Sequence, residues 1–169
     1  MGLLVGPVRL RKCGEDGAVY ESSRLTSSND LIQNNAFNGV LAQFDSYFET
    51  DSSDVIQNNS ADGVSLLLNS SLRIIGAKIT GNAGNGVRVD QNSAARIGFV
   101  AGSSPNVITG NGGNGVYVAD LSFVRFTPEN NITSNVTQPD VACHQQFSAT
   151  RGALVNIGGG ITNCAEPTP

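Results

Sequence analysis

The sequence has no tryptophan, one methionine and one histidine, and only 14% of its residues are charged. Its three cysteines, Cys13, Cys143 and Cys164, are too few for a disulfide-rich scaffold, and their spacing fits no metal-binding motif. No apolar run approaches the ~18 residues of a membrane span. The apolar segment 2–6 is also too short for the core of a signal peptide. We therefore expect no membrane partner, no bound metal ion and no other cofactor.

The charge balance is mildly acidic, with a formal net charge of −4 and a sequence pI of about 4.8. Because no basic excess exists to neutralise phosphates, we do not expect nucleic acid as a partner. The 169 residues suffice for one domain with a sizeable core.

Glycine and asparagine are abundant, and they often stand side by side. The pairs are Asn38-Gly39, Asn85-Gly86, Asn111-Gly112 and Asn114-Gly115. Such pairs favour turns with a left-handed backbone, and they recur too often for a helical protein. The apolar runs between them are short and rich in valine and isoleucine, which predicts strands.

A unit of about 24 residues repeats along the chain, in which an isoleucine is followed three positions later by an asparagine. Its instances are Ile32/Asn35, Ile56/Asn59, Ile79/Asn82, Ile108/Asn111 and Ile132/Asn135. A Gly-Val pair follows most of these units, at Gly39, Gly63, Gly86 and Gly115. The one clearly longer interval contains residues 102–105, which we interpret as a loop.

Each repeat holds three short strands and three turns, which is the content of one turn of a solenoid. Stacking such coils ~4.8 Å apart pairs every strand with neighbours above and below it. Inward valine, isoleucine and leucine residues then form one continuous core. We therefore predict an all-β solenoid of about six coils.

The Ile-x-x-Asn and Gly-Val units resemble the repeats of right-handed parallel β-helix proteins, the pectate-lyase-like superfamily, over roughly Leu25 to Cys164. The resemblance implies a right-handed, single-stranded parallel β-helix with an internal asparagine stack. The stacked residues would be Asn35, Asn59, Asn82, Asn111 and Asn135. Residues 1–28 match the register poorly. We expect an N-terminal cap or a degenerate first coil there, and a β-helix with a C-terminal cap over residues 29–169.

Active enzymes of this superfamily carry their catalytic groups on the outer face of the strand that here follows Gly-Val. The polar residues on or beside that face are Arg88, Asp90, Tyr117, Asp120 and His144. A lyase would need clustered carboxylates for Ca²⁺ and a base, and a hydrolase would need paired carboxylates. Only Asp90 is central, so we assign no catalytic residue and expect Arg88 and Asp90 to form a local ion pair. The face remains a candidate ligand-binding surface.

A second set of outward residues is more regular. It consists of Glu49 followed by Arg73, Arg96, Arg125 and Arg151. Guanidinium groups stacked ~5 Å apart repel one another unless anions lie between them. The pattern therefore predicts either a strip that binds an anionic polymer, such as an acidic polysaccharide, or a solvated face that prevents edge pairing.

Several functions remain open from the sequence. The first is a non-enzymatic module, structural or carbohydrate-binding. The second is a polysaccharide lyase-like or hydrolase-like enzyme, or a fragment of one. The third is an oligomeric fibre or spike segment that associates through the ends or faces of the solenoid. Thr80, Thr109 and Thr133 share one register position. One threonine per coil in three coils gives only weak support for an ice-binding surface.

The two C-terminal cysteines also leave alternatives open. Cys143 and Cys164 could form a disulfide that holds the last coil, or they could be two buried free thiols. A disulfide would favour a secreted or cell-surface location.

Overall fold

The computed structural model describes residues 9–11, 14–98, 104–127, 130–143, 154–157 and 164–165. Within these residues it contains strands and turns and no helix. The strands are β1 (Arg9–Arg11), β2 (Ala18–Glu21), β3 (Arg24–Ser27), β4 (Leu31–Gln33), β5 (Val40–Gln43), β6 (Tyr47–Thr50), β7 (Val55–Gln57), β8 (Val64–Leu66), β9 (Ser71–Ile74), β10 (Lys78–Thr80), β11 (Val87–Val89), β12 (Ala94–Ile97), β13 (Val107–Thr109), β14 (Val116–Val118), β15 (Phe123–Phe126), β16 (Asn131–Thr133), β17 (Val141–Cys143), β18 (Leu154–Ile157) and β19 (Cys164–Ala165).

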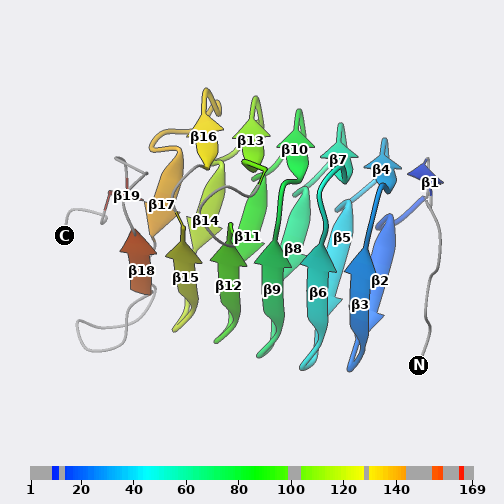
Figure 1. The fold of residues 1–169 in the computed structure, drawn as a ribbon, viewed down its shortest axis with the longest axis horizontal. Helices are drawn as coiled ribbons and strands as arrows, with labels where there is room; N and C mark the ends of the chain where they lie inside the picture. Colours follow the sequence, from blue (N-terminus) through cyan, green and yellow to red (C-terminus); the bar gives the residue numbers. More distant parts are fainter. Residues whose placement is uncertain are drawn as a thin grey trace.

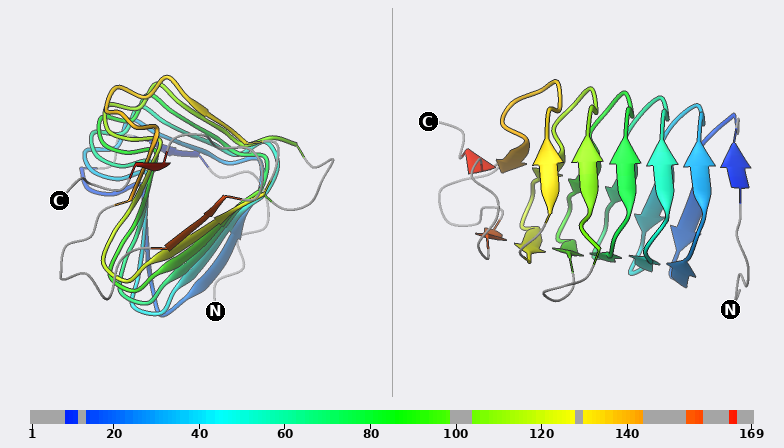
Figure 2. Two further views of the ribbon diagram at one scale, coloured as in Figure 1. Left: turned by 90° about the vertical axis from the view of Figure 1, so that its left-hand side faces the viewer. Right: turned by 45° about the horizontal axis from the view of Figure 1, so that its top comes forward.

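Every third strand joins the same parallel sheet, so the chain winds as a solenoid (Figure 1). Sheet A has the order β1-β4-β7-β10-β13-β16, sheet B the order β19-β17-β14-β11-β8-β5-β2, and sheet C the order β18-β15-β12-β9-β6-β3. Viewed along the axis, successive coils superimpose, and the three sheets surround a common interior (left view of Figure 2). The predicted all-β parallel solenoid with three strands per coil is confirmed.

The core follows the alternation of each strand. In sheet B, Val40, Val64, Val87, Val116 and Val141 lie side by side in register. All five are fully buried. Isoleucines of sheet A and apolar residues of sheet C complete the same cluster, which includes Ile56, Ile79, Phe48 and Phe126. Because identical residue types stack from coil to coil, one continuous core runs from Leu25 to Val141.

The two ends extend the pattern in different ways. At the N-terminal end, β1, β2 and β3 pair in register with β4, β5 and β6, so this part is built as a coil. Whether residues 1–28 form a separate unit stays a prediction. At the C-terminal end, Cys164 is paired with Val141 in sheet B. In the sequence, Cys164 stands three residues after Ile161, where an Ile-x-x-Asn unit would have its asparagine, but the structure places Cys164 in strand β19.

The asparagine stack is confirmed as a hydrogen-bonded ladder inside the turn between sheets A and B. The Asn35 side-chain amide donates to Asn59 Oδ1 at 2.9 Å, and Asn59 donates to Asn82 at 2.8 Å. Asn82 donates to Asn111, and Asn111 to Asn135, both at 2.9 Å. Each acceptor oxygen also receives the backbone N–H of the asparagine one coil earlier.

The ladder ends on a carboxylate. Asp140 Oδ1 accepts both the backbone N–H and the side-chain amide of Asn135, at 2.9 and 2.8 Å. Asp140 therefore occupies the place that the next asparagine would take. This cap was not predicted, because Asp140 is only five residues from Asn135 rather than one coil away.

Two further ladders of hydrogen bonds, which the sequence analysis did not predict, connect successive coils at two other positions of the repeat. Ser46, Ser70 and Ser93 each donate a backbone N–H to the serine hydroxyl of the next coil, at 3.1–3.2 Å. The residue before each glycine forms the other ladder, which contains Asp16, Asn38, Asp62, Asn85 and Asn114. The regular spacing of these residues was visible in the sequence. Spacing alone, however, does not show whether a polar turn residue hydrogen-bonds to the next coil.

The glycines of the Gly-Val pairs are required by space rather than by backbone angle. Neither residue of the four Asn-Gly pairs has a positive φ, so the predicted left-handed turns are not at these positions. A Cβ on Gly39, Gly63 or Gly86 would lie 2.6 Å from the carbonyl oxygen of the next coil's glycine. Some left-handed residues instead lie singly, directly before each ladder asparagine, at Asn34, Asn58, Gly81, Gly110 and Ser134. Others lie in pairs between sheets B and C. These pairs are Phe44/Asp45, Leu68/Asn69, Gln91/Asn92 and Asp120/Leu121.

Candidate functional site

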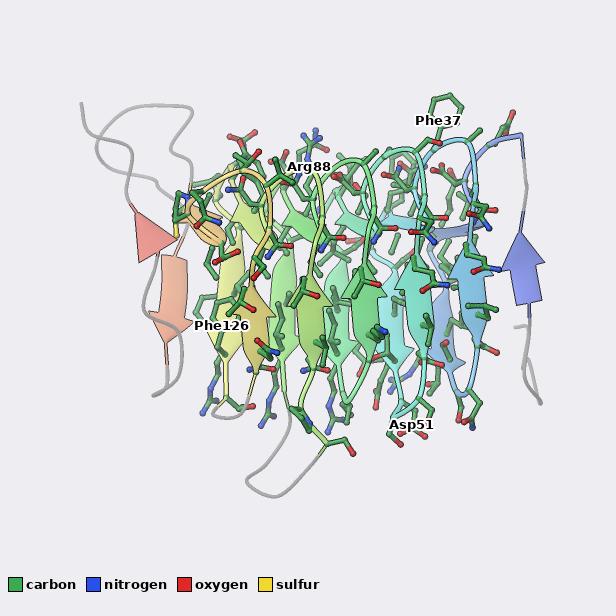
Figure 3. The ribbon with its side chains drawn as sticks, turned by 90° about the horizontal axis from the view of Figure 1, so that it is seen from above. Phe37, Asp51, Arg88 and Phe126 are labelled. Atoms are coloured by element: carbon green, nitrogen blue, oxygen red, sulfur yellow. The ribbon has the colours of Figure 1, made fainter. Side chains whose placement is uncertain are left out.

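The outer face of sheet B carries Arg88, which Figure 3 labels, and Tyr117 of the first group of predicted residues. Strand β11 places Arg88 beside Tyr117 of β14. The Arg88 guanidinium donates to Asp90 Oδ2 from Nη2 at 2.7 Å and from Nε at 3.2 Å. The Arg88 side chain is 42% exposed, whereas that of Asp90 is only 6% exposed. The structure thus contains the ion pair expected between these two residues.

Neighbouring charges and burial act on the pKa values of this group. Burial raises the pKa of Tyr117, and the nearby Asp90 carboxylate raises it further. Burial by itself would lower the pKa of Arg88, but hydrogen bonding to Asp90 and the charges of Asp90 and Asp62 raise it overall. The Arg88 guanidinium is therefore held firmly in its charged form.

Asp90 is poorly placed for acid–base chemistry. Its Oδ2 accepts both bonds from Arg88, and its Oδ1 accepts the backbone N–H of Gln91 at 2.8 Å. A general base needs an oxygen that can accept a proton from a ligand. Both oxygens of Asp90 are instead committed to neighbouring groups. Asp120 lies in the adjacent turn, and His144 lies outside the described residues.

The outer face of sheet C carries the second predicted group. Parallel pairing places Glu49 beside Arg73, Arg73 beside Arg96, and Arg96 beside Arg125. We call Arg73, Arg96 and Arg125 the arginine column. Neighbouring members are one strand spacing apart, ~4.8 Å between backbones. Arg125 is exposed, and Arg73 and Arg96 are partly exposed.

The fourth predicted member of the column needs correction. The residue paired with Arg125 in β18 is Asn156, so Arg151 does not continue the column. In the sequence, Arg151 follows Asp140 by 11 residues, whereas Asn156, which holds the column position in β18, follows Asp140 by 16. Arg151 itself lies outside the described residues.

A network of side chains bounds the arginine column at its N-terminal end. The Arg24 guanidinium lies 4.3 Å from the centre of the Tyr47 ring. The Tyr47 hydroxyl donates to a Glu49 carboxylate oxygen, and the other Glu49 oxygen accepts from Arg73 at 3.4 Å. Burial and the bond to Glu49 raise the pKa of Tyr47. Glu49 therefore balances the charge of Arg73, at the edge of the column.

Some of the remaining predictions concern cysteine and metal ligands. Cys143 is disulfide-bonded, as the sequence analysis allowed, and its pairing with Cys164 stays a prediction. No group of three His, Cys, Asp or Glu side chains that could hold a metal occurs among the described residues. The same part of the chain has no helix that is long and apolar enough to cross a membrane.

Asp62 lies one coil before Asn85 in the aspartate and asparagine ladder and carries a buried carboxylate. Its Oδ1 accepts the backbone N–H of Asn85 at 2.7 Å and the Asn85 side-chain amide at 3.0 Å. Burial raises its pKa above 3.8, although Asn85 and Arg88 act in the opposite direction. A raised carboxyl pKa means that folding favours the protonated form. The contribution to stability is therefore complete below pH 3.8 and is lost as the pH rises through the folded-state pKa.

Asp62→Asn is thus expected to stabilise the protein at pH 7, and the gain should shrink at pH 3. The variant keeps the acceptor oxygen and removes the buried charge, as in the asparagines above and below it in the ladder. Urea unfolding at both pH values measures the difference. Asn38→Asp, the reverse change one coil earlier, should destabilise more at pH 7 than at pH 3. An equal effect of Asp62→Asn at both pH values would contradict this assignment.

Comparison with known protein families gives one match. A family model described as a right-handed beta helix region matches residues 5–163. Comparisons with curated proteins and with solved structures gave no match.

Proposed function

The chain belongs to the right-handed β-helix family, and from this premise we propose that it is a non-enzymatic module that binds an acidic polysaccharide. The observation that carries the proposal is the arginine column on the outer face of sheet C. A solenoid holds such side chains at fixed intervals along its axis, which suits a ligand with a repeating charge.

The local charge supports an anionic ligand. The outward residues of β3, β6, β9, β12 and β15 include four arginines and one glutamate. The whole chain has a formal net charge of −4, so this face has the opposite sign from the molecule overall. Concentrated charge of one sign attracts a partner of the other sign and raises the rate of association. Guanidinium groups also bind carboxylates through paired hydrogen bonds.

The face of sheet B supports the non-enzymatic part of the proposal. Both oxygens of its central carboxylate, Asp90, accept hydrogen bonds from Arg88 and Gln91. The family fold offers a scaffold for many functions, so function must be argued from the side chains rather than from the solenoid itself. Among the described residues, the arginines in register therefore favour ligand binding over hydrolysis, which would need paired carboxylates.

The double variant Arg96→Gln/Arg125→Gln should weaken binding to polygalacturonate about tenfold or more, because it removes two charge-assisted contacts. Isothermal titration calorimetry at low and at physiological ionic strength provides the measurement. Salt should weaken wild-type binding strongly and the variant's residual binding much less, because screening acts on the charges that were removed.

Lys78→Gln is the matched control, since Lys78 is an exposed cation on sheet A rather than on sheet C. It should retain nearly wild-type affinity. Absence of wild-type binding at low ionic strength would refute the proposal. Release of unsaturated sugars from polygalacturonate in the presence of Ca²⁺ would instead favour the lyase alternative.

A further inference from the structure

A second column of residues lies beside the arginine column on sheet C. It is formed by the first residue of each strand, and the backbone pairs Ser71 with Ala94 and Ala94 with Phe123. Each of these residues lies two positions before an arginine, so both side chains point to the same side of the sheet. Ala94 is exposed, and Ser71 and Phe123 are partly exposed.

The second column has an uneven profile. Ser71 and Ala94 are small, so β9 and β12 present a low surface next to long arginine side chains. Phe123 follows on β15 and raises an aromatic ring at the next position. On the opposite side, Tyr47 of β6 precedes Ser71, but Arg24 covers its ring. Of these two aromatic residues, Phe123 is thus the better candidate to contact a ligand.

We infer that the two columns form one binding surface for a linear polyuronate whose chain lies along the solenoid axis. Sugar rings lie over Ser71 and Ala94, one ring packs against Phe123, and the ring carboxylates contact the arginine column. This inference rests on the proposed function. It deepens that function by requiring a ligand with both sugar rings and carboxylates, and by setting the direction of its chain.

The direction follows from the register. Both columns run across the strands, from coil to coil, and therefore parallel to the axis of the solenoid. A polymer lying along the strands would meet only one arginine, whereas one lying along the axis meets three. The apolar face of a sugar ring can pack on an aromatic side chain while its polar groups stay available for hydrogen bonds.

Glu49 limits the surface at its N-terminal end. Its carboxylate accepts from Arg73 at 3.4 Å, so it competes with a ligand carboxylate for the same guanidinium. Glu49→Gln removes this competing charge and should strengthen binding to polygalacturonate severalfold. A variant with a damaged fold would lose affinity, so a gain of affinity in Glu49→Gln cannot result from misfolding.

The decisive experiment compares polygalacturonate with polyphosphate, which has repeating charge but no rings. Phe123→Ala should weaken polygalacturonate binding about tenfold, as expected for loss of one ring contact, and leave polyphosphate binding unchanged. Phe37→Ala is the control, because Phe37 is 55% exposed and lies between β4 of sheet A and β5 of sheet B rather than on sheet C. It should change neither affinity.

The outcomes separate the inference from the proposed function. If the arginine double variant weakens binding to both polymers but Phe123→Ala affects both equally or neither, the inference is wrong and the proposed function stands. If the arginine double variant changes neither affinity, the proposed function fails together with the inference. Selective loss of polygalacturonate binding in Phe123→Ala, with a gain in Glu49→Gln, supports both.

Discussion

Gly63→Ala is expected to destabilise the protein by at least about 3 kcal/mol, at or beyond the upper end of overpacking effects. A Cβ at this position would lie 2.6 Å from the carbonyl oxygen of Gly86 and 2.6 Å from Ile79 Cγ2. It would also lie 2.8 Å from Asn82 Nδ2. Two of these three atoms belong to the next coil's backbone and to the asparagine ladder, which cannot move without breaking hydrogen bonds. The methyl group therefore forces adjacent coils apart.

Chemical denaturation of Gly63→Ala and Gly14→Ala provides the comparison. A Cβ added to Gly14 would meet no atom within 4 Å, and Gly14 has no positive φ, so alanine there should be nearly neutral. Gly86→Ala should repeat the result of Gly63→Ala, because its Cβ would lie 2.4 Å from Ile108 Cγ2 and 2.6 Å from the Gly115 oxygen. A loss below about 1 kcal/mol in Gly63→Ala would show that the coils can separate at little cost.

Asn82→Ala is expected to cost about 4 kcal/mol, because it breaks the ladder in its middle and leaves several buried polar groups unsatisfied at about 1–3 kcal/mol each. Asn82 Oδ1 accepts the backbone N–H of Asn59 at 3.1 Å and its side-chain amide at 2.8 Å. Its own amide donates to Ile56 O at 3.3 Å and to Asn111 Oδ1 at 2.9 Å. Water cannot replace these partners easily, since Asn82 is only 1% exposed.

Asn131→Ala is the matched control for the ladder. Asn131 is exposed on β16, and its side-chain oxygen accepts from the Thr133 hydroxyl. Its replacement should change the unfolding free energy by less than about 0.5 kcal/mol. If Asn82→Ala and Asn131→Ala have similar effects, the buried ladder contributes less than its hydrogen bonds imply.

Much of the fold could be predicted because each coil repeats the same pattern of apolar strand residues and polar turn residues. Val64, Val87 and Val116 recur with a nearby glycine and asparagine, and only stacked coils can bury them all. The asparagine ladder was expected from the resemblance of the repeat to those of right-handed parallel β-helix proteins. Its cap at Asp140 was not, because a residue that ends a repeat does not share the repeat's spacing.

The candidate site was less predictable. The register of Arg73, Arg96 and Arg125 followed from the repeat, but Arg151 was wrongly added because the repeat degenerates after β17. Asp90 was expected at the centre of an outer face, and its burial against Arg88 depends on how neighbouring coils pack. Exposure depends on all surrounding residues and cannot be obtained from alternation within one strand.

The sequence by itself determined the solenoid, its three strands per coil and the inward valine and isoleucine residues, because periodic patterning is a local property of the chain. Only the tertiary structure decided why glycine precedes each valine, since that reason is the 2.6 Å approach of the next coil. It also decided which polar groups pair with one another, as Arg73 does with Glu49 and Asn135 with Asp140. Those contacts depend on distances between coils and between side chains, which no spacing along one strand specifies.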